Sequence, residues 1–157
     1  MKQALMLLFA LAGSFAIAAQ NEPCLPANYS YLGGGLGFSQ NNAVVNAHAG
    51  LNSKVFGLEA SVIAHTDNRN PALLNVQFIK SFYGYDTRLS FLGGMSYQVT
   101  TADKVGGTQT RGIVGLEFAK LLRRRGEYTN GLLYFRGQVS GEYFIFMVGL
   151  QGMFSKN

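Results

Sequence analysis

From Tyr29 to Phe154 the sequence alternates apolar and mixed side chains at every second position, and this period of two limits the choice of fold more than any other feature. Successive side chains of a β-strand point to opposite faces, whereas a helix repeats every 3.6 residues. The clearest segment covers residues 43–52, where every odd position is Ala, Val or Leu and the even positions include Asn and His. The pattern therefore predicts strands that are apolar on one face.

Eight such segments follow one another in a chain of 157 residues, a length that suits one domain. The predicted strands are residues 29–38, 43–52, 55–65, 74–79, 88–97, 111–118, 132–136 and 144–154. Their spacing favours an antiparallel up-and-down order with both ends of the chain on one side. The links expected on that side are near residue 53, at 82–86 and at 121–127, and those on the other side are at 40–42, 66–71, 100–109 and 139–142.

The turn between the second and third segments sets their register. If residues 53–54 form a two-residue turn, counting back along both strands places His48 opposite Glu59 and Asn46 opposite Ser61. All four side chains fall on the mixed face. We expect a structural ion pair or hydrogen bond between His48 and Glu59.

The residues before the alternating region have the composition of a secretory signal peptide. Lys2 supplies a positive charge, residues 5–17 are almost entirely apolar, and small residues follow, so we expect the mature chain to begin at Ala19 or Gln20. The apolar run is shorter than the roughly 20 residues of a spanning helix, which favours cleavage over an anchor. The single Cys24 cannot form an internal disulfide. The expected divisions are a cleaved signal peptide at 1–19, a short extended leader at 20–28 and a barrel at 29–157.

Charge separates a membrane barrel from a soluble one. Charged residues make up 13% of the chain, against about 25% in an average soluble domain. A soluble eight-stranded barrel of the lipocalin type would turn its apolar face inward and its mixed face to water. The mixed face here is mostly Gly, Ser, Asn and Gln, which suits a narrow interior. We therefore predict an all-β fold, an eight-stranded antiparallel up-and-down transmembrane β-barrel with a closed, side-chain-filled lumen.

The few charges on the mixed face are expected to pair inside the lumen, because a lone buried ion is unstable. The predicted polar network of the lumen consists of His48, Glu59, Arg88, Arg111, Glu117 and Arg136. The glycine-rich residues 32–37 lack the Lys-Ser/Thr of a phosphate loop, and we expect them to make room for large side chains that cross the lumen.

Residues 29–154 resemble the small eight-stranded outer-membrane proteins, the group that includes opacity-type proteins and the OmpA-type transmembrane domain. The most specific part is the last strand, residues 144–154, which is similar to the C-terminal signal read by the barrel-assembly machinery. Residues 155–157 extend past the aromatic that usually ends such chains, and the outer loops are shorter than those of opacity proteins. The resemblance implies an outer-membrane location, with outer-membrane lipid, lipopolysaccharide and the assembly machinery as partners.

Little in the sequence points to catalysis. His48, Glu59 and Ser61 share one face, as in a hydrolase, but that face is the lumen, whereas a lipid substrate would lie outside. His48 and His65 are the only histidines and lack metal-ligand spacing with the carboxylates. We expect no catalytic residue, no metal and no cofactor. The first functional hypothesis is a structural or interaction barrel; the alternatives are a narrow passive channel and, less favoured because the His-x-Ser motif of the lipid A deacylases is absent, a lipid A-modifying enzyme.

A basic cluster accounts for most of the net charge, which is +5 for the chain and +4 once Lys2 is removed. It is expected in a periplasmic turn between the sixth and seventh strands. Export excludes nucleic acid as a partner. The first interpretation is a solvated turn, and the second is contact with phospholipid head groups of the inner leaflet or with another anionic periplasmic partner. The cluster consists of Lys120, Arg123, Arg124 and Arg125.

Overall fold

The computed structural model describes residues 25–26, 28–40, 42–66, 72–99, 109–124, 127–141 and 143–155. The predicted signal peptide, its cleavage site and Cys24 lie outside these residues. Within the described ranges, no helix is long and apolar enough to cross a membrane. The strands are β1 (Tyr29–Ser39), β2 (Asn42–Asn52), β3 (Gly57–His65), β4 (Ala72–Tyr83), β5 (Thr87–Val99), β6 (Thr110–Arg124), β7 (Glu127–Ser140) and β8 (Tyr143–Phe154).

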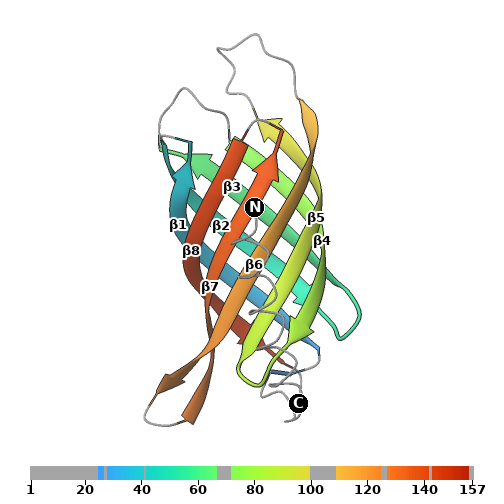
Figure 1. Ribbon diagram of the computed structural model, residues 1–157, viewed down its shortest axis with the longest axis vertical. Coiled ribbons are helices and arrows are strands. Elements are labelled where there is room, and N and C mark those ends of the chain that lie inside the picture. The colour runs from blue at the N-terminus through green and yellow to red at the C-terminus, as the bar shows by residue number, and fades with distance from the viewer. Residues whose placement is uncertain are drawn as a thin grey trace, which may run out of the picture.

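Each strand pairs antiparallel with its neighbours in sequence, and β1 also pairs with β8, so the sheet closes into a barrel (Figure 1). Closure leaves no open sheet edge along the wall. The predicted eight-stranded up-and-down fold is therefore confirmed. Most strands are longer than predicted, above all β6 and β7, because backbone pairing continues past the apolar residues that reveal a strand in the sequence.

The two ends of the barrel differ in the links that they carry. We call the end at which Tyr29 and Phe154 lie the terminal rim; it is at the bottom of Figure 1. The links at the terminal rim are residues 53–56, 84–86 and 125–126. The links at the opposite rim are residues 40–41, 66–71, 100–109 and 141–142. Both groups agree with the predicted meander.

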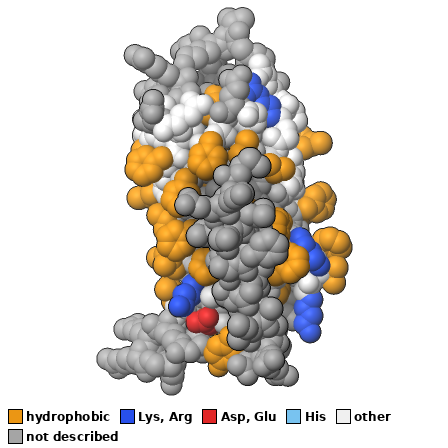
Figure 2. Space-filling model, in the orientation of Figure 1, with side chains coloured by type: hydrophobic (Ala, Val, Ile, Leu, Met, Phe, Trp, Pro, Cys, Tyr) orange, Lys and Arg blue, Asp and Glu red, His pale blue; other side chains and the backbone are white. Residues whose placement is uncertain are grey.

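The apolar face of the strands points away from the barrel axis. Phe56, Leu58, Val114 and Phe146 are 64%, 46%, 62% and 46% exposed, whereas Glu59 is completely buried. Hydrophobic side chains cover much of the visible wall in Figure 2. This arrangement is the reverse of a lipocalin-type barrel, and it confirms the predicted assignment of the two faces.

The turn between β2 and β3 lies one residue later than predicted. Lys54 and Val55 form its tip, and the residues on either side are joined: the backbone nitrogen of Ser53 donates to the carbonyl oxygen of Phe56 (3.0 Å). The Ser53 hydroxyl reinforces the closure, because it donates to the same carbonyl (2.5 Å) and accepts from the Phe56 amide (3.2 Å). Ser53 therefore closes the turn instead of forming its tip.

This displacement moves the register of β2 and β3 by two positions. His48 lies opposite Ser61, and Glu59 lies opposite Gly50. The predicted pairing of His48 with Glu59 is therefore wrong, as is that of Asn46 with Ser61. A shift of two positions leaves every side chain on its predicted face, because the strand repeat is two.

Three of the four residues of the basic cluster lie in a strand and not in the predicted turn. Lys120, Arg123 and Arg124 belong to β6, which continues to Arg124 and pairs with β7 from Glu127 onward; Arg125 lies outside the described residues. Pairing of β6 with β5 ends at Lys120, and pairing of β7 with β8 begins at Gly131. The two strands therefore project beyond the terminal rim as a two-stranded arm, visible at the lower left of Figure 1.

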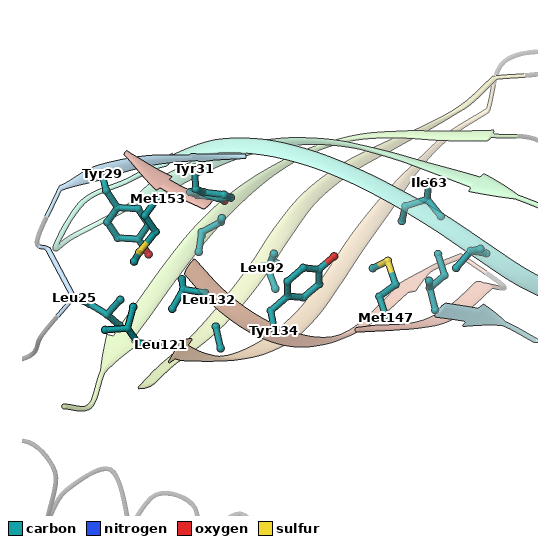
Figure 3. Close-up of a cluster of buried hydrophobic side chains, with 14 of the residues drawn as sticks. Leu25, Tyr29, Tyr31, Ile63, Leu92, Leu121, Leu132, Tyr134, Met147 and Met153 are labelled. Carbon is teal, nitrogen blue, oxygen red and sulfur yellow. The ribbon is translucent and has the colours of Figure 1, made fainter. Parts of the chain in front are cut away.

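Apolar side chains fill parts of the lumen. Figure 3 places Leu25, Leu121 and Met153 toward one end of the cluster and Ile63 and Met147 toward the other. Leu25 comes from the predicted leader and is 3% exposed. The leader was expected to be extended and had no assigned packing role, so the burial of Leu25 was not predicted.

Candidate functional site

The charged side chains of the lumen come from four strands and meet inside the barrel. Glu59 is on β3, Arg88 on β5, Glu117 on β6 and Arg136 on β7. All four are buried. Each occupies a lumen-facing position of its strand. The two-residue repeat of the sequence therefore predicted that they share the inner face.

Arg136 is the centre of the network. Its Nη1 and Nη2 donate to Oε1 and Oε2 of Glu59, at 2.5 and 2.7 Å. Its Nε donates to Oε2 of Glu117 at 2.8 Å, and its Nη2 contacts the same oxygen. The planar guanidinium thus binds one carboxylate in a bidentate manner and a second along another edge, a geometry that lysine could not supply.

Arg88 holds the other side of Glu117. Its Nη2 donates to Oε1 of that carboxylate and to Oε1 of Gln151 (2.9 Å), while its Nη1 donates to the Tyr29 hydroxyl. Gln151 also donates to Oε2 of Glu117 (3.2 Å). Two cations and two anions therefore alternate in the order Glu59, Arg136, Glu117, Arg88, and their charges cancel. Because they cancel, the burial of four ions is compatible with a stable barrel.

Both carboxylates are fully used within this network. The Tyr31 hydroxyl donates to Oε2 of Glu59 at 2.8 Å, so each oxygen of Glu59 and Glu117 accepts at least one hydrogen bond. A carboxylate held in this way is a structural counter-ion. Proton transfer to or from it would require the network to open first.

A second group of polar side chains is composed of neutral amides and hydroxyls. Gln138 donates to Gln77 across the lumen (2.8 Å), and Asn75 and Gln77 both donate to the hydroxyl of Ser61 (3.2 and 3.4 Å). Asn75 and Gln77 were predicted to lie on the mixed face, with no assigned role. The alternation of the sequence places both residues on the inner face. Because neither is charged, nothing in the sequence predicted that they would pair.

His48 is buried in the lumen, but it is not a partner of Glu59. Its Nδ1 lies 2.6 Å from Oδ1 of Asn46, and its ring meets the ring of Tyr134 edge-on with centroids 5.0 Å apart. The imidazole also lies against Gly33: a Cβ at that position would be 2.4 Å from Nε2 of His48. The expected role of the glycine-rich segment, to make room for a large side chain, therefore holds at Gly33.

Arg111 is separated from the other predicted members of the network. It is half-buried near the opposite rim, and its Nη2 donates to Oε1 of Gln109 at 2.6 Å. Within the described part of the chain, it makes no hydrogen bond or ion pair with Glu59 or Glu117. Arg111 is six residues before Glu117 on the same strand. The two residues therefore share the predicted inner face but lie at different levels along the barrel.

The predicted basic residues lie apart from the lumen network. Lys120 is exposed on the outer side of β6, and Arg123 and Arg124 follow it along the arm. Among the described residues, no group of three His, Cys, Asp or Glu side chains could hold a metal ion.

Comparisons with known proteins identify the fold and not a close relative. The sequence matches no family model and no curated protein. Among solved structures, the chain is similar to the N-terminal β-barrel domain of OprF from Pseudomonas aeruginosa, with a TM-score of 0.52, 15% sequence identity, and coverage of 80% of this chain and 97% of that one. The chain therefore shares the eight-stranded OmpA-like barrel fold that its sequence resembles.

Proposed function

We propose that the chain is a structural barrel of the bacterial outer membrane, closed to solutes by its own side chains. The observation that carries the proposal is the separation of the two faces. Apolar side chains such as Phe78 (68% exposed) cover the outside, whereas Arg136 and Glu59 are buried inside. A closed sheet satisfies its backbone internally, so an apolar outer wall suits hydrocarbon.

The filled lumen supports a structural role over a passive channel. An ion crossing the barrel would have to pass the layer in which Glu59, Arg136, Glu117 and Arg88 bind one another. It would then meet the amides of Gln77 and Gln138, which also bond across the lumen. Passage would require these contacts to break together, so the resting barrel is expected not to conduct.

The same packing supports a non-catalytic role. His48 and Ser61 are opposite one another in the register, a pairing that could suggest a hydrolase. However, the Ser61 hydroxyl accepts bonds from two amides, and both side chains are buried inside the barrel. A lipid substrate outside the wall would not reach them.

Fractionation and gel migration test the membrane assignment. The mature chain should sediment with outer membranes, and its folded form should migrate faster than the boiled form on a gel. A soluble periplasmic protein with a single gel position would contradict the proposal.

Bilayer recording and lipid analysis separate the alternatives. The purified barrel should give no lasting ion current, with a wide-lumen porin in the same bilayers as the positive control. A lasting current would replace the closed barrel with the channel. Lipid A that differs in mass between cells with and without the protein would replace it with the enzyme.

A further inference from the structure

Charge is distributed unequally between the two rims. The links and strand ends at the terminal rim carry six cations and two acids, whereas the opposite rim carries three of each. The cations of the terminal rim are Lys54, Lys80, Lys120, Arg123, Arg124 and Arg125, and the acids are Asp86 and Glu127. The charges of the opposite rim are Arg69, Lys104, Arg111, Asp67, Asp103 and Glu142. Because the ionic network in the lumen is neutral, the excess of +4 outside the chain termini belongs to one rim.

Two cations of this rim, Lys80 and Lys120, lie on the outer wall beside apolar side chains. Lys80 is exposed on β4, its Nζ donates to the carbonyl oxygen of Val55 at the β2–β3 turn (3.0 Å), and the same atom is 5.5 Å from the centre of the Phe56 ring. The aliphatic stem therefore follows the wall while the ammonium stays at the rim. Lysines adopt this posture at the boundary between hydrocarbon and head groups.

An apolar hollow opens next to Phe56. It has a volume of ≈ 570 Å³, and its outward-facing lining includes Leu51, Phe56, Leu58, Phe78 and Phe154, with Ser53 at its edge. A smaller hollow of ≈ 320 Å³ is lined by Lys120, Leu121, Leu122 and Leu133, with Asp86 as its acidic member. Each hollow thus combines a hydrocarbon surface with a cation at or near its rim.

We propose that the terminal rim binds anionic phospholipid, with acyl chains against the two hollows and the lipid phosphates near Lys80 and Lys120. This inference rests on the proposed membrane barrel, since only an inserted barrel holds the rim at the level of head groups. A zwitterionic lipid would fill the hollows equally well, but it carries no net charge to balance the excess of +4. The partner is therefore selected by the charge of its head group.

Lipid selectivity in vesicles tests the inference. The mature wild-type chain is reconstituted into phosphatidylcholine vesicles that contain spin-labelled phosphatidylglycerol or spin-labelled phosphatidylcholine, and the immobilised fraction of each label is measured. We expect the immobilised fraction to favour phosphatidylglycerol over phosphatidylcholine by about three- to tenfold at low salt. The preference should fall in concentrated salt. Equal immobilisation of both labels would overturn the inference.

Two matched variants locate the preference on the molecule. K80Q/K120Q removes two cations from the terminal rim, and R69Q/K104Q removes two from the links of the opposite rim. The first should lose most of the preference and the second should keep it. An equal loss in both would show that only net charge matters and would also overturn the inference.

The failure of the two proposals can be distinguished. Folding and insertion of each variant are checked by gel migration and by flotation with vesicles of pure phosphatidylcholine. A wild-type chain that does not insert contradicts the membrane barrel, and the lipid site falls with it. A chain that inserts without preferring the anionic lipid contradicts the lipid site alone.

Discussion

Arg136 and Glu59 join opposite walls of the barrel. Their strands, β7 and β3, are separated by three strands in either direction around the closed sheet, yet the two side chains meet in a bidentate contact at 2.5 and 2.7 Å. Glu117 occupies the strand next to Arg136 and binds the same guanidinium. A single arginine therefore ties together three positions of the wall, and its removal would leave two carboxylates with one cation.

Removal of Arg136 alone should strongly destabilise the barrel. In R136Q, Glu59 and Glu117 share the lumen with only Arg88, and an unpaired buried charge lowers the free energy of unfolding by about 3–5 kcal/mol. The double variant E59Q/R136Q keeps the neutral pair of Arg88 and Glu117, so it should be more stable than R136Q. Urea unfolding in vesicles measures R136Q, E59Q and the double variant, with K54Q in an exposed turn as the control. A double variant that loses the sum of the two single losses would contradict the coupling.

Gly33 should not tolerate even one methyl group while His48 faces it. A Cβ would lie 2.4 Å from the imidazole, so G33A should lower the free energy of unfolding by about 1–3 kcal/mol. The control is G93A on the outer wall, where a Cβ meets nothing within 4 Å. G33A/H48A should recover part of the loss because the clashing ring is gone. Equal stability of G33A and G93A would contradict the steric explanation.

The features of the fold that could be predicted from the sequence are those with a periodic signal. Alternation identified every strand and its apolar face, and it placed Glu59, Arg88, Glu117 and Arg136 on the inner face, where they meet. The two-residue repeat determines which face a side chain occupies but not its level along the barrel. Arg111 therefore shares the correct parity and still lies apart from the network.

Other features depend on geometry that a period of two does not contain. The observed partner of His48 differs from the predicted one because the Ser53 hydroxyl closes the turn. The alternation gave no sign of this, since a register shift of two leaves every side chain on the same face. The arm was missed because the cations from Lys120 onward resemble a solvated turn in the sequence. Backbone pairing with β7 instead keeps Lys120, Arg123 and Arg124 in a strand. Leu25 precedes the alternating region, so no pattern marked it.

Disulfide formation distinguishes the observed register from the predicted one. Leu51 faces Leu58 directly, whereas the predicted turn would place Ala49 opposite Leu58. Directly opposed residues lie within the Cα separation of a disulfide, about 4.4–6.8 Å, whereas diagonal neighbours are about 7–8 Å apart. In a C24S background, L51C/L58C should therefore cross-link faster than A49C/L58C. The reverse order, measured by non-reducing electrophoresis or mass spectrometry, would favour the earlier turn.

A charge on the outer wall should be unfavourable in proportion to its depth in the bilayer. Val114 lies within β6 and is 62% exposed, whereas Val55 lies in a turn of the terminal rim and is 55% exposed. V114R should lower the free energy of unfolding in vesicles by about 2–4 kcal/mol and V55R by about 0–1 kcal/mol, because arginine near the rim reaches water. Similar losses in the two variants would argue against a membrane around the wall.

Leu25 should close the lumen at the terminal rim. It is 3% exposed and belongs to the buried cluster that includes Leu121, Leu132 and Met153, although it precedes the first strand (Figure 3). Truncation of a buried leucine leaves a cavity, and L25A should lower the free energy of unfolding by about 2 kcal/mol or more.

Thiol labelling reports whether Leu25 also keeps water out. In a C24S background, L132C should react slowly with a water-soluble maleimide because Leu132 is completely buried. Adding L25A should accelerate that reaction. I63C is the control and should react at the same rate with or without L25A, since Ile63 lies toward the other end of the cluster from Leu25 (Figure 3). Acceleration at both cysteines would indicate general loosening of the barrel, and acceleration at neither would mean that Leu25 packs without sealing the rim.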